Sequence, residues 1–521
     1  MKNLLRLCGF FVVILATPAF AQGDDGWKRA DSAHFSVFSD GSAEELVEYT
    51  RTLEKFDGLL RFWFDKPSRD DDQRLSVYLL EDQRAVGDLF GKRRVAGFYK
   101  AGPEAVYAVA HREGGAFNGQ TVLFHEYAHH FMFREFNVPA PAWLTEGFAE
   151  FLGTVQFADD GRWTYGALAE HRAGELRRWD DLEIQKLLAW PQESRGGYVI
   201  PGFYGWSWAL THMLYMDEDR GARIGAYLDR LSAGEQPLPA AEAVFGDLER
   251  LERRLESYVR NEMDFAISDE PFPWNRTVEL SMLDPDDGRM LELRLRRMTG
   301  HEPDEIRDDL LAYAAGSASP AQALAEAGMA AFDVEAGERY EFKEKNDRAM
   351  AGPYFPEAAQ LADRALAADP ENVRANLLKG RILARQLKES RSTDADAWTE
   401  ARRHFQMANR SDPGNAEALF GFARSYVWEG REGKMMGDAF LAAFRRAPQV
   451  RLFRIGLAYD LARQGQYDSA IALVQPIAND PHYPKGGRKI VERIEAMRAS
   501  GAKFPELDYN DEYDGDEDSE D

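Results

Sequence analysis

The pattern of apolar and polar positions divides the chain into a short part that contains strands and a longer part made of helices. Apolar stretches of strand length occupy 34–38, 75–80 and 105–110. Stripes with the helical period occupy 43–64, 82–90, 119–134, 143–155, 204–216 and 248–263. A few strands followed mainly by helices predict an α+β amino-terminal domain with a small mixed sheet over 22–268.

Proline, aspartate and glycine crowd the segment 269–305, which we interpret as the junction between two domains. Within this junction, the pattern leaves open whether 278–295 forms a hairpin or a helix.

Beyond the junction, X-Pro pairs recur at intervals of 43, 35 and 33 residues, at Asp369-Pro370, Asp412-Pro413, Ala447-Pro448 and Asp480-Pro481. The run 401–413 has the spacing Ala-x3-Phe-x2-Ala-x4-Pro and resembles the second helix of a tetratricopeptide repeat. This resemblance implies an all-α domain of tetratricopeptide-like helical repeats over 306–505. A generic alanine-rich helical bundle is the alternative.

The two ends of the chain have compositions unlike the rest. A positively charged start, an apolar run and the small-x-small pattern at 19–21 predict a secretory signal peptide over 1–21. We therefore expect export to the periplasm or the cell exterior. The single cysteine, Cys8, lies in this segment, so we expect no disulfide and no cysteine ligand in the mature chain. At the other end, ten of the sixteen residues of 506–521 are acidic, which predicts a disordered acidic tail.

Charge and hydropathy exclude two classes of partner. The formal net charge is −25, so the chain should repel phosphate backbones, and we expect no nucleic-acid binding. After the signal peptide, no apolar run reaches the roughly 18 residues of a membrane helix, so we expect no membrane span.

The predicted helix 119–134 carries the sequence His125-Glu126-Tyr127-Ala128-His129, an HExxH motif. Residues four apart lie nearly on one helix face, so both imidazoles can reach one ion. Zinc accepts imidazole ligands and, with three protein ligands, keeps a fourth position for water. Glu126 can take the proton of that water and pass it to a leaving amine.

Farther along, Glu146 lies in the segment WLTEGFAE at 143–150. Here the sequence resembles the gluzincin peptidases, the aminopeptidase-type and peptidase-MA-like families, in which this pattern follows HExxH. The resemblance implies a zincin-like fold in which His125, His129 and Glu146 bind one Zn²⁺ ion and Glu126 is the general base. The spacing between His129 and Glu146 is two residues shorter than in the common aminopeptidases, which leaves endopeptidase activity open.

Other residues are candidates for supporting roles. Glu150 follows Glu146 by one helical turn and is placed to hold the second nitrogen of a histidine ligand, unless it is a solvent-facing carboxylate. The resemblance also implies a downstream tyrosine or histidine that stabilises the oxyanion. Tyr204 is our first candidate, followed by Tyr198 and His212, and an aromatic core position is the alternative for Tyr204.

These observations favour an exported zinc metallopeptidase whose helical repeats recruit protein substrates or partners. We expect the strand at 105–110 to hold an extended peptide substrate as the edge strand of zincins does, unless it is an ordinary sheet strand. Two alternatives remain: a catalytically retired peptidase fold acting as a protein-binding scaffold, and hydrolysis of a non-peptide acyl substrate.

Overall fold

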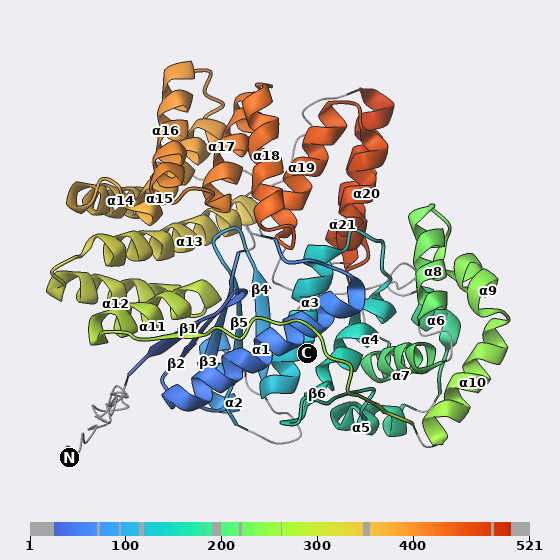
Figure 1. Ribbon diagram of the computed structural model, residues 1–521. Helices are drawn as coiled ribbons and strands as arrows, with labels where there is room; N and C mark the ends of the chain where they lie inside the picture. Colours follow the sequence, from blue (N-terminus) through green and yellow to red (C-terminus); the bar gives the residue numbers. More distant parts are fainter. Residues whose placement is uncertain are drawn as a thin grey trace, which may run out of the picture.

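The computed structural model describes residues 26–69, 73–92, 95–113, 119–179, 181–189, 200–217, 221–261, 263–346, 355–480 and 484–501. The predicted signal peptide with Cys8 and the predicted acidic tail lie outside these ranges. The described chain has an amino-terminal region with a mixed sheet and helices, and then a region made only of helices (Figure 1). The predicted fold class is confirmed at this level.

The central sheet has six strands in the order β4-β5-β3-β2-β1-β9. Its strands are β1 (Lys28–Asp31), β2 (Phe35–Ser39), β3 (Leu75–Leu80), β4 (Gly97–Ala101), β5 (Val106–His111) and β9 (Glu279–Met282). Strands β2, β3 and β5 are parallel, and the outer strands β4, β1 and β9 pair antiparallel. The three predicted strands form the parallel centre of this sheet.

The prediction that 105–110 forms an edge strand is wrong. Strand β5 occupies this segment and pairs with β3 on one side and β4 on the other. The edge strand next to β5 is β4, a five-residue strand that the apolar pattern did not reveal. Strand order is set by pairing between distant segments, so a local pattern cannot identify the edge.

Both faces of the central sheet are covered by helices, which explains why its inner strands are apolar almost throughout. Val77 and Ala108 point into the main core beneath α1 (Ala43–Phe64) and α3 (Gly119–Glu135). Tyr78 and Val109 point to the opposite face, where they pack with Val86 of α2 (Gln83–Phe90) and with α11 (Pro285–Thr299).

The segment 278–295, for which the sequence left hairpin and helix open, contains a strand and then a helix. Strand β9 pairs with β1 and completes the central sheet. Helix α11 follows directly, with Pro285 in its first turn and Asp284 as a side-chain cap that accepts a hydrogen bond from the Asp287 amide. Part of the predicted junction therefore belongs to the folded amino-terminal region: β9 is a strand of its sheet, and α11 packs on one face of that sheet.

The rest of the amino-terminal region is mainly helical. Its helices are α4 (Ala142–Gly153), α5 (Glu170–Arg178), α6 (Ile184–Ala189), α7 (Phe203–Met216), α8 (Ala222–Ser232), α9 (Pro237–Phe245) and α10 (Leu248–Arg260). A small antiparallel sheet consists of β6 (Gln156–Phe157), β7 (Trp163–Tyr165) and β8 (Ala266–Ser268).

The carboxy-terminal region continues from α11 as helices packed against their sequence neighbours. They are α12 (Pro303–Gly316), α13 (Ala321–Asn346), α14 (Pro356–Ala368), α15 (Val373–Glu389), α16 (Ala395–Ser411), α17 (Ala416–Glu429), α18 (Lys434–Arg446), α19 (Arg451–Arg463), α20 (Tyr467–Ala478) and α21 (Pro484–Ser500). The first three X-Pro pairs lie between α14 and α15, α16 and α17, and α18 and α19. They separate successive pairs of helices, as the spacing predicts. Among the described residues, no helix is both long and apolar enough to cross a membrane.

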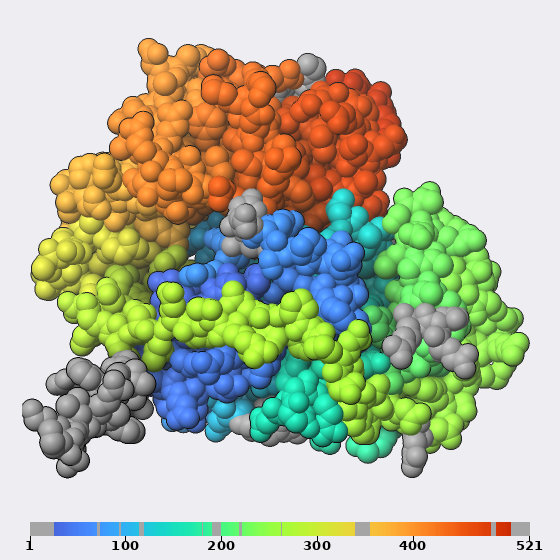
Figure 2. All heavy atoms as spheres, viewed as in Figure 1, coloured from blue at the N-terminus to red at the C-terminus, as the bar shows by residue number. Residues whose placement is uncertain are grey.

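The helical region packs directly on the amino-terminal region (Figure 2). In the turn between β4 and β5, Glu104 forms ion pairs with Arg297 of α11 and, at 2.5 Å, with Arg374 of α15. Near the end of α3, the buried Arg454 of α19 donates to the carbonyl of Phe133 at 3.0 Å and to Asn137 Oδ1 at 2.6 Å. Helix α15 therefore contacts the β4–β5 hairpin, and helix α19 contacts α3, which carries the HExxH motif.

Candidate metal centre

Helix α3 places the two histidines of the HExxH motif side by side. Its other face is anchored in the core, where the Phe124 ring stacks on Phe56 of α1 with centroids 3.9 Å apart. The Nε2 atoms of His125 and His129 lie 3.1 Å apart, and the side chains are 18% and 9% exposed. One ion could therefore reach both imidazoles, as the spacing of four residues predicts.

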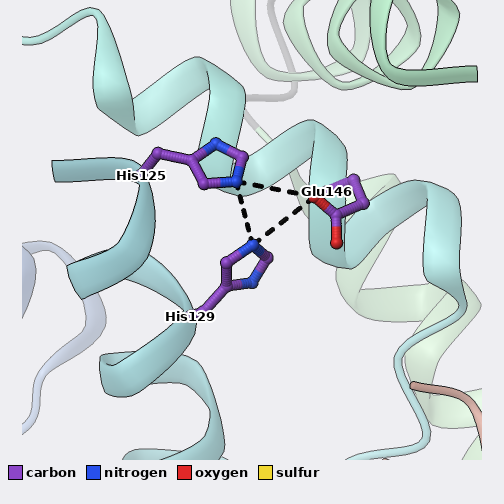
Figure 3. A group of neighbouring side chains, drawn as sticks. All are labelled: His125, His129 and Glu146. Carbon is purple, nitrogen blue, oxygen red and sulfur yellow. Dashed lines mark hydrogen bonds and ion pairs between the residues drawn. The ribbon is translucent and has the colours of Figure 1, made fainter. Parts of the chain in front are cut away.

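Helix α4 brings Glu146 to the same point (Figure 3). Its carboxylate is fully buried, and Oε2 lies 3.6 Å from His125 Nε2 and 3.4 Å from His129 Nε2. Close packing holds α4 here: a Cβ added at Gly147 would lie 2.2 Å from Thr211 Oγ1 of α7. The three predicted ligands thus converge, although Glu146 comes from a different helix.

The spacing of the three ligand atoms suits a tetrahedral metal ion. Zinc bonds of about 2.0–2.2 Å at tetrahedral angles separate neighbouring ligand atoms by about 3.3–3.6 Å. The observed separations among His125, His129 and Glu146 are 3.1, 3.4 and 3.6 Å. The structure thus contains a group that could hold a metal ion.

The protonation state of His125 also favours metal binding. Burial lowers the pKa of His125 to about 4, because nearby Glu150 and Glu146 offset the loss of solvation only in part. Its ring is therefore neutral near pH 7, which is the form that binds metals. Glu146 is buried beside this ring, and a divalent cation at this point would compensate a negative charge on its carboxylate.

Glu126, the predicted general base, lies on α3 directly after His125 and is partly exposed. It precedes His130 by one helical turn, and His130 contacts Tyr99 of β4, so Glu126 lies toward the side of α3 that faces this edge strand. The neighbouring His130 is buried and shares a hydrogen bond of 2.9 Å with the Tyr99 hydroxyl. Tyr99 was not a sequence-based candidate, because β4 was not recognised as a strand.

Glu150 lies behind the first ligand rather than in solvent. It is 2% exposed, and its Oε1 atom is 3.5 Å from His125 Nδ1, the nitrogen that faces away from the cluster. Burial raises the pKa of Glu150, but His125, His171 and Arg172 outweigh burial and lower it to about 2. The position agrees with the predicted supporting role, which remains a prediction.

Two residues of α5 that the sequence did not single out hold Glu150. His171 Nε2 lies 2.7 Å from Oε2, and Arg172 donates to Oε1 from Nε at 2.9 Å and from Nη2 at 2.6 Å. No motif marks these residues, and α5 was itself not predicted. Their role follows only from the way α5 docks on α4.

The candidates for the oxyanion donor occupy different environments. Tyr204 begins α7 and packs its ring 4.6 Å from the Arg172 guanidinium, on the α5 side of the site. His212 is buried, and its ring nitrogens lie 2.8 Å from the Gly166 carbonyl and 2.7 Å from the Tyr258 hydroxyl. Both nitrogens of His212 are thus engaged within the core, which leaves Tyr204 the better candidate. Tyr198 lies outside the described residues.

A second group of histidine and carboxylates lies between β2 and α1. His34 Nδ1 is 3.0 Å from Glu54 Oε2 and 3.1 Å from Asp57 Oδ2. Asp57 also accepts hydrogen bonds from Arg61 Nε at 2.8 Å and from the Tyr127 hydroxyl at 2.6 Å. The distances alone would allow a metal ion here as well. However, Arg61 already supplies positive charge to this cluster.

Comparison with known proteins assigns no family to the chain, because no protein-family model and no curated protein matches it.

Proposed function

We propose that this chain is an exported zinc metallopeptidase of the gluzincin type. The observation that carries the proposal is the convergence of His125, His129 and Glu146 within 3.6 Å of one another, with a glutamate directly beside the first ligand. Two imidazoles, a buried carboxylate and a neighbouring glutamate can supply the three protein ligands and the general base of a hydrolytic zinc site.

The chemistry follows from the placement of each group. A zinc ion held by His125, His129 and Glu146 would activate a water molecule and polarise the scissile carbonyl. Glu126 accepts the proton of the attacking water and delivers it to the amine nitrogen as the C–N bond breaks. The Nδ1–H of His125 points to the Glu150 carboxylate, 3.5 Å away, which keeps the Nε2 lone pair directed at the cluster. Tyr204 is the candidate hydrogen-bond donor to the oxyanion.

Two features support a peptide as the substrate. The motif segment resembles peptidases over 125–150, and the edge strand β4 lies beside α3 on the Glu126 side. An extended peptide could add to that edge through backbone hydrogen bonds, which would bring its scissile bond toward the catalytic residues. Strand β4 thus takes the role that we predicted for 105–110.

The carboxy-terminal helices are proposed to be tetratricopeptide-like repeats. Proline pairs between successive helix pairs and small residues at close helix contacts support this assignment, as where Gly380 and Gly421 both face the Phe405 ring. Because α15 and α19 already contact the amino-terminal region, recruitment of protein substrates or partners would use the remaining faces.

Replacing the general base tests the proposal. We expect Glu126→Gln to bind one equivalent of zinc as the parent does. It should hydrolyse a mixed peptide library about 10²–10⁴-fold more slowly at neutral pH, which is the usual contribution of a positioned general base to the rate. Glu44→Gln, an exposed residue of α1, is the matched control and should retain full activity. Equal hydrolysis by Glu126→Gln and the parent would refute the mechanism. A parent that binds less than about half an equivalent of zinc would favour the scaffold alternative.

A further inference from the structure

A half-buried arginine connects the two sides of the candidate active site. Arg172 lies on α5, and its contacts reach both the carboxylate behind His125 and the start of α7, where Tyr204 lies. We propose that Arg172 is a positioning residue that fixes Glu150 behind the metal ligand and, through separate contacts, fixes Tyr204. The inference rests on the proposed function, because it gives a catalytic purpose to the contacts that link Glu150 to Tyr204 through Arg172.

The first half of the link runs from the cluster to α5. Glu150 Oε1 is 3.5 Å from His125 Nδ1 and accepts two hydrogen bonds from Arg172, at 2.9 Å from Nε and 2.6 Å from Nη2. The same oxygen therefore contacts both the ligand and the arginine. Since Glu150 is 2% exposed, solvent cannot take over the work of orienting it.

The second half of the link runs from α5 to α7. Arg172 Nη1 donates to Glu175 Oε1 at 3.0 Å, and Glu175 Oε2 accepts the backbone N–H of Gly205 at 2.8 Å. The guanidinium carbon lies 4.6 Å from the Tyr204 ring centroid. A carboxylate on an amide of the first turn and a cation on the adjacent ring both hold the beginning of α7 in place.

These contacts use properties that lysine does not share. A planar guanidinium can donate along its edge to two carboxylates while its face lies on an aromatic ring. An ammonium group at this position could still neutralise Glu150, but it could not reproduce the two edges and the stacked face together. The variant Arg172→Lys should therefore retain the effect on zinc binding, which acts through Glu150, but lose the effect on the position of Tyr204.

His171 provides an internal comparison on the same helix. Its Nε2 atom lies 2.7 Å from the other oxygen of Glu150, so the carboxylate keeps this partner when Arg172 is replaced. This remaining contact should allow an Arg172 variant to fold, and His171→Gln should disturb Glu150 without disturbing Tyr204.

The experiment compares full-length mature variants by zinc affinity, measured by chelator competition, and by steady-state peptide hydrolysis. We expect Arg172→Met to weaken zinc binding about 10–100-fold, the usual effect of losing an outer partner of a ligand. We expect Arg172→Lys to bind zinc within about threefold of the parent, since it retains the charge, yet to lose kcat at saturating zinc with little change in KM. His171→Gln should show the opposite pattern, with weaker zinc binding and a kcat near that of the parent once zinc saturates.

The control is Arg177→Met, an exposed arginine of the same helix, which should match the parent in both measurements. The absorption spectrum of the Co²⁺-loaded protein reports ligand geometry directly and should change for Arg172→Met but not for Arg172→Lys.

If Arg172→Met does not fold, the outcome for Arg172→Lys alone decides. Parental zinc affinity together with parental kcat in that variant would overturn the proposal. A parent that binds zinc without cleaving peptides would contradict the proposed function alone, because zinc affinity and the Co²⁺ spectrum would still test the link. A parent that binds no zinc would overturn both.

Discussion

The amino-terminal region contains two buried clusters of histidine and carboxylate with similar distances but different charge balance. In the cluster of His34, Glu54 and Asp57, the contacts from the histidine to the carboxylates are 3.0 and 3.1 Å. In the cluster of His125, His129 and Glu146, the corresponding contacts are 3.4 and 3.6 Å. Both groups are close enough to hold a metal ion, so proximity alone does not separate them.

The difference lies in the cations that the chain itself supplies. Arg61 donates to Asp57 at 2.8 Å, and the pKa of His34 is raised, so positive charge meets the carboxylates of the first cluster. In the second cluster, burial lowers the pKa of His125 and keeps it neutral beside Glu146. A buried carboxylate needs a compensating charge. The comparison therefore teaches that two groups of similar proximity differ in the protonation of their histidines: the first favours a charged His34, whereas the second favours a neutral His125, the form that binds a metal.

The largest expected effect separates the clusters by metal binding. Glu146→Gln should weaken zinc affinity more than about 100-fold, because even outer partners of ligands are worth about 10–100-fold. Asp57→Asn should lower thermal stability but leave zinc affinity unchanged. Chelator competition on both variants measures this difference. Equal losses of affinity would mean that the first cluster also contributes to metal binding.

A smaller effect should appear when the chain's own cation is removed. Arg61→Met leaves the buried Asp57 without its guanidinium, and breaking such a buried pair costs about 3–5 kcal/mol of unfolding free energy. Arg51→Met removes an exposed pair with Glu48 on the same helix and should cost less than about 1 kcal/mol. Urea denaturation of the zinc-loaded proteins measures both. A loss below 1 kcal/mol for Arg61→Met would show that the first cluster does not depend on this cation.

The smallest expected effect is a pH dependence of opposite sign in the two clusters. Burial lowers the pKa of His34, but the hydrogen bond with Glu54 and the charge of Asp57 outweigh burial and raise it overall. Protonated His34 thus stabilises the fold fully below the usual pKa of about 6.5, and this contribution disappears as the pH rises through the raised pKa. Zinc affinity at the second cluster should instead increase as the pH rises through the lowered pKa of His125, about 4, because histidine binds metal when deprotonated.

Urea denaturation of the parent and His34→Asn at several pH values between about 6 and 9 tests this sign. The difference in unfolding free energy between the two proteins should be largest at the acidic end and should shrink toward alkaline pH. A difference that grows with pH would show that His34 is held neutral in the folded protein.

The sequence by itself determined the features that depend on neighbouring residues. The spacing of four between His125 and His129 places both imidazoles on one helix face, because helical geometry is local. Apolar strand-length runs located β2, β3 and β5, and the X-Pro pairs marked the breaks between helix pairs of the carboxy-terminal region. The pattern WLTEGFAE marked Glu146 through its resemblance to known peptidases, which is information beyond periodicity.

Only the tertiary structure decided which distant segments meet. It assigned the edge of the sheet to β4 instead of 105–110, and it placed α5 so that His171 and Arg172 hold Glu150. It also shifted the pKa of His34 upward and that of His125 downward. The physical reason is that strand order, helix docking and the compensation of buried charge all depend on contacts between residues far apart in the chain. Local spacing does not encode those contacts.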